Sequence, residues 1–364
     1  MIETHTVNAL LHPSLKQAQA FTILTFVNGL VAPSFLFCAG FAFAITAHRR
    51  WQEYVSLKPT LWRYCARLLF ILCIGYSLHV PVYSLRKILT LTDEGLWTSF
   101  FQADILQVIA LTLMGGLLLV IIIRNEQRFI LLSAFLAIIV IFIAPITWEM
   151  NFDHLPLWLR PYLSPNCKSQ FPLIPWSAFL LSGLVIGYLF LKAREKGGER
   201  SLVQRLLVLS VGTIIVSLGI EFIPLTLYPN HDFWQASPEF FFVRLGLVVL
   251  CSIVLWRYEQ RRMTAQSAET TPKRSVFALF GQESLLVYYV HLMIVYGETQ
   301  SWSFIRLFGP TLYYVECFGL FIGLTLGMYV LAYAWRWMKG WNPKIARMVQ
   351  WVTVASFVVA FVVR

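Results

Sequence analysis

Charged residues are scarce in this sequence. They make up 13% of the chain, whereas a typical soluble domain carries about 25%. Hydrophobic residues make up 58%, and the mean hydropathy is +0.67. With so little polar surface, the chain cannot cover a water-exposed body of 364 residues. A long polar linker is also missing, and apolar stretches recur to the C-terminal end, so we expect one transmembrane domain over residues 1–364.

Paired cysteines and clustered basic residues are missing as well. None of the six cysteines forms a C-x-x-C pair, and nearly all of them lie in apolar stretches, which gives no support to a disulfide framework or a zinc site. We expect no metal. The formal charge of +11 is spread over short loops rather than gathered on one helix or tail, so we expect no nucleic-acid partner.

Apolar stretches long enough to cross a bilayer, about 20 residues each, recur roughly ten times. They centre on residues 26–47, 61–82, 104–123, 128–147, 172–192, 203–224, 238–257, 275–296, 311–336 and 345–363. The fold class that this pattern predicts is all-α, a polytopic bundle of transmembrane helices embedded in the lipid bilayer.

Lysine and arginine alternate between rich and poor loops along the chain. The loop at 193–204 is rich in them, whereas the long loops at 83–103, 148–171 and 225–237 carry few. By the positive-inside rule the rich loops face the cytoplasm and both chain ends face outside. The loops at 148–171 and 225–237 are also rich in aromatic residues, which stack on sugars but equally form the aromatic belt of a membrane interface.

Polar side chains inside the membrane are costly, about 2.5–3.5 kcal/mol for a charge, and therefore mark candidate sites. Six of them map to the outer half of the membrane: His5, His79, Asp104, Glu221, Arg244 and His291. Gln107 lies with Asp104 at the start of an inward-running span. We assign catalysis to the pair of histidines at 5 and 291 with Asp104, because histidine acts as a base or nucleophile and a carboxylate fixes its tautomer. His79, Gln107, Glu221 and Arg244 are candidate substrate-binding residues. For any single residue of the whole set, the catalytic candidates included, a snorkelling or hydrogen-bonded structural role is the alternative.

On the cytoplasmic half, Arg63 and Arg67 lie four residues apart and so share one face of a helix. Such a face can hold phosphates, while ordinary positive-inside loading is the alternative. Glu283 is a partner for Arg67 or a polar lining of the same path. These three are the candidate residues for binding an anionic cofactor.

Five segments carry a resemblance to one family. They are Met1-Ile-Glu-Thr-His5-Thr, Ala32-Pro33-Ser-Phe-Leu-Phe-Cys-Ala-Gly40, Asp104-Ile-Leu-Gln107-Val-Ile-Ala-Leu111, Phe171-Pro-Leu-Ile-Pro-Trp176 with Gly183 and Gly187, and Gly281-Gln-Glu-Ser-Leu-Leu-Val-Tyr-Tyr-Val-His291. Together, in this order, they resemble the bacterial branch of the heparan-α-glucosaminide N-acetyltransferase-like membrane proteins.

The resemblance implies a transfer of an acetyl group from cytoplasmic acetyl-CoA to an amino sugar on the opposite side of the membrane. It implies a location in the bacterial cytoplasmic (inner) membrane as a multi-pass protein. The family uses a histidine near its first outer loop. In this sequence the matching residue is His5, and His12 is the alternative. His291 and Asp104 also match family positions. A homodimer is left open.

The family has eleven transmembrane helices and begins with one bearing an Arg…Asp…Arg-Gly pattern, which this sequence lacks. Residues 1–11 look like the outer end of that helix, so we expect most of the first helix to be missing from this chain.

The function that we expect is a membrane-embedded acyltransferase acting on an extracytoplasmic sugar or glycan. In one version His5 forms an acyl-imidazole, and in the other it deprotonates the acceptor during direct transfer. The alternatives are a transporter or flippase of a glycan precursor and a noncatalytic subunit of a glycan-assembly complex.

Overall fold

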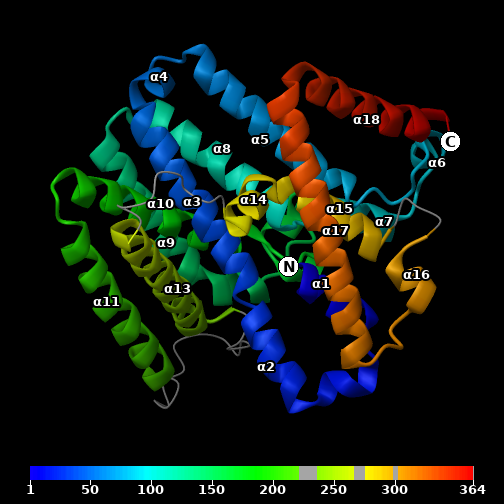
Figure 1. The fold of residues 1–364 in the computed structure, drawn as a ribbon, viewed down its shortest axis with the longest axis horizontal. Coiled ribbons are helices and arrows are strands. Elements are labelled where there is room, and N and C mark those ends of the chain that lie inside the picture. Colours follow the sequence, from blue (N-terminus) through cyan, green and yellow to red (C-terminus); the bar gives the residue numbers. More distant parts are fainter. Residues whose placement is uncertain (221–235, 266–274, 298–301, 364) are drawn as a thin grey trace. The chain divides into compact units, whose positions relative to one another are not determined.

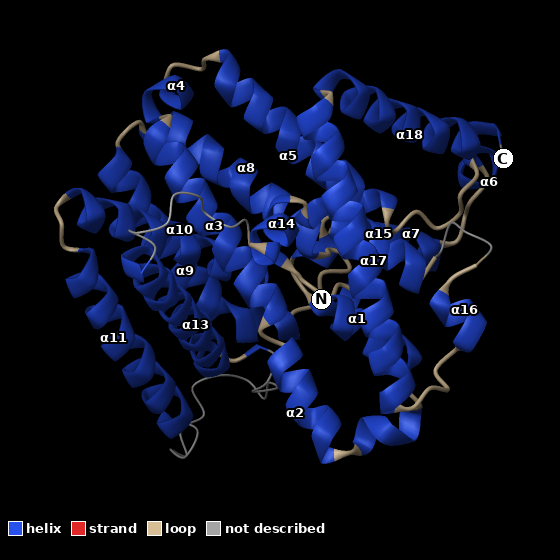
Figure 2. Cartoon of the chain, in the orientation of Figure 1, coloured by secondary structure: helices blue, strands red, loops and turns tan. Residues whose placement is uncertain are grey.

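The structure is a computed structural model that describes residues 1–220, 236–265, 275–297 and 302–363. In these residues the regular elements are helices joined by loops (Figure 2), and there is no β-strand beyond one isolated bridge between Leu11 and Leu312. The all-α class expected from the sequence is confirmed. The chain divides into two compact units, whose helices are labelled in Figure 1.

The first unit comprises Met1–Gly29, Val80–Asp93 and Gln266–Arg364. Its helices are α1 (Ile2–Leu10), α2 (Gln19–Asn28), α6 (Leu85–Leu89), α14 (Val276–Gln282), α15 (Ser284–Val295), α16 (Phe304–Phe308), α17 (Tyr314–Trp341) and α18 (Pro343–Val363), with a 3₁₀ turn at Pro13–Gln17. Helix α1 packs against α15 and α17, and its last residue Leu10 and the following Leu11 are fully buried in the core that the three helices share.

The second unit comprises Leu30–His79 and Glu94–Ala265. Its helices are α3 (Val31–Arg49), α4 (Trp51–Val55), α5 (Pro59–Ser77), α7 (Glu94–Phe101), α8 (Ile105–Ile123), α9 (Glu126–Glu149), α10 (Leu173–Glu195), α11 (Glu199–Ile220) and α13 (Pro238–Ala265), with 3₁₀ turns at Arg160–Tyr162 and Pro165–Cys167. Helix α10 packs on α3 and α9, α5 on α8, and α11 on α13.

Helices α3 and α10 approach each other through glycines. A Cβ atom on Gly40 would lie 1.9 Å from the Leu180 carbonyl oxygen, and one on Gly183 would lie 2.0 Å from the Phe37 carbonyl oxygen. Backbone at these distances leaves no room for a side chain. Small residues at such crossings let transmembrane helices pack by close van der Waals contact, and this explains why the sequence motifs carry glycine at these positions.

Within the described residues, eight helical stretches are long and apolar enough to cross a membrane. They are Gln19–Arg49, Ile105–Ile123, Glu126–Glu149, Leu173–Glu195, Glu199–Ile220, Pro238–Arg262, Tyr314–Trp341 and Pro343–Val363. The bent pair α14 and α15 makes up to nine. The chain is therefore an integral, multi-pass membrane protein.

Two of the expected spans differ from the structure. The expected span at 61–82 is the 19-residue helix α5, which is not among the eight stretches apolar enough to cross a membrane. The arginines in the first half of α5 lower its mean hydropathy. The span at 275–296 is broken at Glu283, where α14 and α15 meet at 81°. Gly281, a weak helix former, lies two residues before the break.

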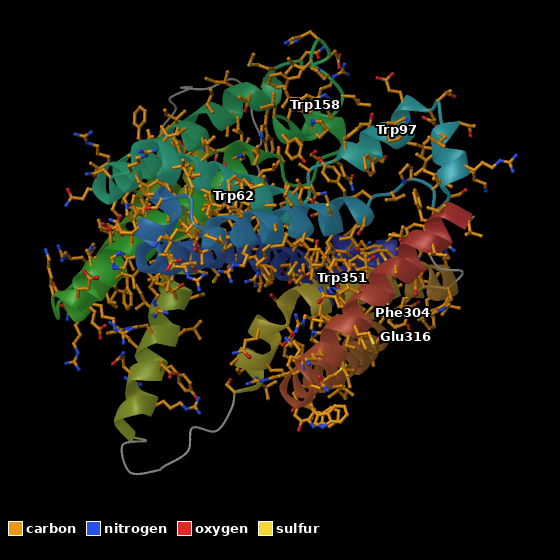
Figure 3. All side chains as sticks on the ribbon, turned by 90° about the horizontal axis from the view of Figure 1, so that it is seen from above. Trp62, Trp97, Trp158, Phe304, Glu316 and Trp351 are labelled. Carbon is orange, nitrogen blue, oxygen red and sulfur yellow. The ribbon has the colours of Figure 1, made fainter. Side chains whose placement is uncertain are left out.

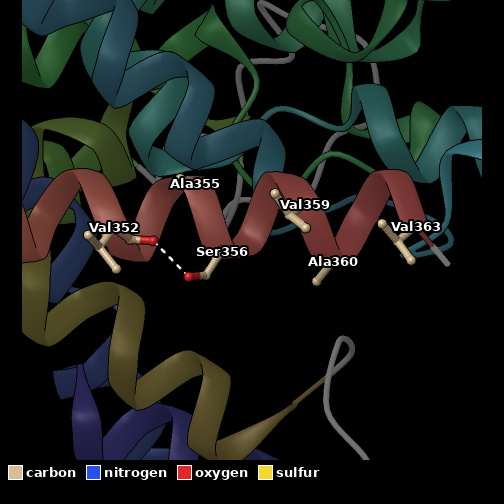
Figure 4. Close-up of a pocket in the computed structure, with 6 residues that line it drawn as sticks. All are labelled: Val352, Ala355, Ser356, Val359, Ala360 and Val363. Atoms are coloured by element: carbon tan, nitrogen blue, oxygen red, sulfur yellow. Dashed lines mark hydrogen bonds between the residues drawn. The ribbon is translucent and has the colours of Figure 1, made fainter.

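Many large apolar side chains face outward, as lipid contact requires. Trp62, Trp158 and Trp351, labelled in Figure 3, are all exposed. Along α18 a shallow hollow of about 580 Å³ is lined by Val352, Ala355, Ser356, Val359, Ala360 and Val363 (Figure 4). The Ser356 hydroxyl donates to the Val352 carbonyl within the helix, so the hollow offers a ligand little polar surface.

Candidate functional site

Two histidines from opposite ends of the sequence lie side by side in the first unit. The rings of His5, on α1, and His291, on α15, have centroids 5.3 Å apart and are tilted by 51°. They meet because α1 and α15 pack together around α17. The His291 side chain is buried, with 1% of the residue exposed, and that of His5 is half-buried.

The hydrogen bond of His291 decides which of its ring nitrogens holds the lone pair. Nδ1 of His291 lies 2.7 Å from the Val287 carbonyl oxygen, which can only accept, so Nδ1 carries the proton. In the neutral ring Nε2 then holds the lone pair; it is buried and finds no hydrogen-bond partner in the described part of the chain. Nδ1 of His5 lies 3.3 Å from the Tyr296 hydroxyl, and either atom can be the donor. A base or nucleophile is thus available at the pair.

His12, the alternative to His5, has a local structural role. Nδ1 of His12 accepts the backbone N–H of Ser14 at the start of the 3₁₀ turn, and the ring is exposed and stacked on Tyr313. Because this nitrogen caps the turn, we prefer His5 as the acyl-handling residue.

Glu283 forms an ion pair with a residue that the sequence did not single out. Its carboxylate lies 2.5 Å from the ammonium of Lys339, near the end of α17. Glu283 stands at the break between α14 and α15 and is buried, whereas the lysine is partly exposed. The pair ties the broken helix to α17, which leaves the cofactor-binding role assigned to Glu283 as a proposal.

In the second unit Asp104 and His79 face each other. An oxygen of Asp104 lies 3.4 Å from Nε2 of His79, and the Gln102 amide lies 2.5 Å from Nδ1 of the same ring. The other Asp104 oxygen accepts the Ile105 backbone N–H at the start of α8. The carboxylate thus caps a helix and can also orient an imidazole, the arrangement that fixes a histidine tautomer.

Two tyrosines lie near this group. The hydroxyls of Tyr76, on α5, and Tyr162, in the 150–172 loop, are 2.5 Å apart. Burial, together with this hydrogen bond, holds the pKa of Tyr162 well above its usual value. The phenol therefore stays protonated and neutral at physiological pH.

The remaining substrate-binding candidates have different surroundings. Arg244, on α13, lies over the rings of Phe240 at 4.0 Å and Trp176 at 5.7 Å, a cation–π arrangement. Gln107 is fully buried on α8. Glu221 and most of the loop at 225–237 lie outside the described residues.

On the expected cytoplasmic side, the structure contains a charged cluster that the sequence did not reveal. The two ring nitrogens of His48 lie 2.6 Å from Glu126 and 2.8 Å from Glu195, and Lys192 lies 3.3 Å from Glu195. These residues belong to α3, α9 and α10, so only the packing of three helix ends brings them together. Arg63 and Arg67 are both exposed on α5.

No cluster of three or more His, Cys, Asp or Glu in the described ranges has the arrangement of a metal site.

The fold and the spans define the class of a polytopic, all-α integral membrane protein, with two histidines side by side in its first unit. The sequence model of the catalytic region of heparan-alpha-glucosaminide N-acetyltransferase matches residues 1–219. The chain belongs to this family of membrane acetyltransferases. No curated protein and no solved structure matched it.

Proposed function

We propose that this chain transfers an acetyl group from cytoplasmic acetyl-CoA to an amino sugar or other glycan on the opposite side of the membrane. The observation that supports this best is the unpaired, buried Nε2 of His291 beside His5. Membership of the acetyltransferase family supports the donor, since acetyl-CoA is the donor that the family resemblance implies.

Two routes are open to the histidine pair. In the first, a ring nitrogen of His5 attacks the thioester carbonyl, the C–S bond breaks, and CoA leaves as a thiolate. The sugar amine then attacks the acyl-imidazole, the bond to the ring nitrogen breaks, and Nε2 of His291 takes the amine proton. In the second, the amine attacks the thioester directly while a histidine takes its proton and CoA leaves. Both routes need a neutral imidazole with a free lone pair.

The donor and the acceptor lie on opposite sides of the membrane, and this explains why the reaction takes place inside a membrane protein. Neither the anionic CoA nor a polar sugar crosses the apolar interior of a bilayer freely, so the acetyl group has to meet its acceptor within the protein. We assign the CoA phosphates to the basic face of Arg63 and Arg67 and the acceptor to the outer half, in a bacterial cytoplasmic membrane.

The test is acetyl transfer from labelled acetyl-CoA to glucosamine by purified protein in detergent, with the His5→Ala and His291→Ala variants. We expect His5→Ala to abolish transfer and leave acetyl-CoA binding intact. His291→Ala should retain measurable activity if that residue orients His5 or takes the proton. Rapid quenching without sugar distinguishes the routes, because only the first gives labelled protein.

The matched control is His12→Ala, which removes an exposed histidine near the same chain end and should leave transfer unchanged. Full activity of His5→Ala, together with loss of activity in His12→Ala, would move the chemistry to His12. Full activity of both variants, and of His291→Ala as well, would remove histidine from the mechanism.

One observation favours a second candidate, a transporter of a glycan precursor. Broken transmembrane helices such as α14 and α15, bent by 81°, often line the substrate sites of transporters. Uptake of labelled sugar into proteoliposomes that contain no acetyl-CoA would support transport, whereas movement of label only together with acetylation supports the acetyltransferase.

A further inference from the structure

Gln107 has a buried amide group whose two polar atoms are both unpaired. The residue is fully buried on α8, and neither its amide nitrogen nor its amide oxygen has a hydrogen-bond partner in the described part of the chain. Buried polar groups are nearly always hydrogen-bonded, and an unpaired one destabilises the fold. A side chain with an unpaired donor and an unpaired acceptor therefore points to a ligand that supplies both.

The amide lies across the α5–α8 contact, against a glycine. A Cβ atom on Gly75 would lie 2.7 Å from the Gln107 amide oxygen, so only glycine leaves this space to the amide. His79 follows Gly75 by four residues, and Asp104 precedes Gln107 by three, which puts each of them about one helical turn away along its own segment. The contact between His79 and Asp104 at 3.4 Å therefore continues the same polar strip.

Aromatic rings gather beside this strip. The ring centroid of Tyr76, the residue after Gly75, lies 5.3 Å from that of Phe100 and 6.5 Å from that of Phe101. Trp97 stacks on Phe101 with centroids 6.1 Å apart. Planar amides and carboxylates beside aromatic faces suit a sugar ring, because its hydroxyls hydrogen-bond and its C–H faces pack on aromatics.

We propose that Gln107 binds two neighbouring hydroxyl groups of the sugar acceptor through hydrogen bonds, and that His79 and Asp104 belong to the same acceptor subsite. One hydroxyl oxygen accepts from the amide N–H, and the adjacent hydroxyl donates to the amide oxygen. The inference rests on the proposed acetyltransferase function and adds to it the group by which the acceptor is recognised.

The test uses Gln107→Met, which keeps the length of the side chain and removes both polar atoms. We expect the KM for glucosamine to rise at least about 10-fold, which corresponds to about 1.4 kcal/mol, while the KM for acetyl-CoA stays unchanged. The melting temperature of the sugar-free protein should be equal or higher, because the unpaired atoms are gone. Gly75→Ala, which crowds the amide, should raise the KM for glucosamine in the same way.

Thr112→Val is the matched control, since it removes another unpaired buried oxygen from α8 and should leave both KM values unchanged. A rise confined to the KM for acetyl-CoA would overturn the proposal and assign the amide to the pantetheine arm. No change in either value would make Gln107 structural.

The inference and the proposed function can fail separately. If the purified protein transfers no acetyl group, stabilisation by glucosamine is measured by thermal shift instead. A shift that is present in the wild type and lost in Gln107→Met supports the subsite even then, and an equal shift in both proteins refutes it.

Discussion

Removal of the Lys339 ammonium should leave a buried carboxylate without its partner. Glu283 is 6% exposed and stands where α14 and α15 meet at 81°, and its carboxylate oxygen lies 2.5 Å from the Lys339 nitrogen. Breaking a buried ion pair from one side costs about 3–5 kcal/mol. The Lys339 side chain is 43% exposed, so water can partly solvate the stranded carboxylate, and we expect the lower limit of about 3 kcal/mol.

The perturbation is Lys339→Met, which keeps the length of the stem, and the measurement is the free energy of unfolding in detergent micelles. Lys344→Met is the control, because that residue is exposed beyond the end of α17 and should change stability by less than about 0.5 kcal/mol. The double variant Glu283→Gln/Lys339→Met should recover most of the loss, since the buried charge is gone. A Lys339→Met protein as stable as Lys344→Met, or a double variant less stable than the single, would refute the reasoning.

Two further outcomes are expected. Arg67→Ala should weaken acetyl-CoA binding, measured by isothermal titration, about 10-fold more than Arg124→Ala. The reason is that a charge-assisted contact to phosphate is worth about 1.5–3 kcal/mol and a solvated loop charge far less. Equal effects would mean that the basic residues attract acetyl-CoA only through their summed charge. At His48, both ring nitrogens face carboxylates, and in the described part of the chain Lys192 and Tyr188 also contact these carboxylates, so the doubly protonated ring is the stabilising form. The cluster should therefore stabilise the fold only while both carboxylates are ionised and the ring is doubly protonated, and this stabilisation should be lost as the pH rises and His48 loses its proton; a His48→Gln protein should not show this loss, and an identical pH profile in both would contradict the role.

The sequence by itself determined the class of the protein, most of its spans and its family. These features are local: an apolar stretch of bilayer length needs no knowledge of its neighbours, and motif segments keep their spacing in the linear chain. The glycines at positions 40 and 183 were visible in the same way, as parts of motifs. The bend at Glu283 was not, because a short polar interruption within a long apolar stretch does not by itself indicate that the helix breaks there.

Only the tertiary structure decided which polar residues meet. His5 and His291 become neighbours because α1 packs against α15 and α17, and Lys339 reaches Glu283 from another helix of the same unit. The cluster at His48 joins the ends of three helices. Hydrophobic periodicity tells which face of a helix is buried but not which helix covers it, because apolar contacts are non-directional and many pairings satisfy the same pattern. Partner choice is set by close packing, as where Gly40 and Gly183 let α3 and α10 touch, and that information lies in three dimensions rather than in any single segment.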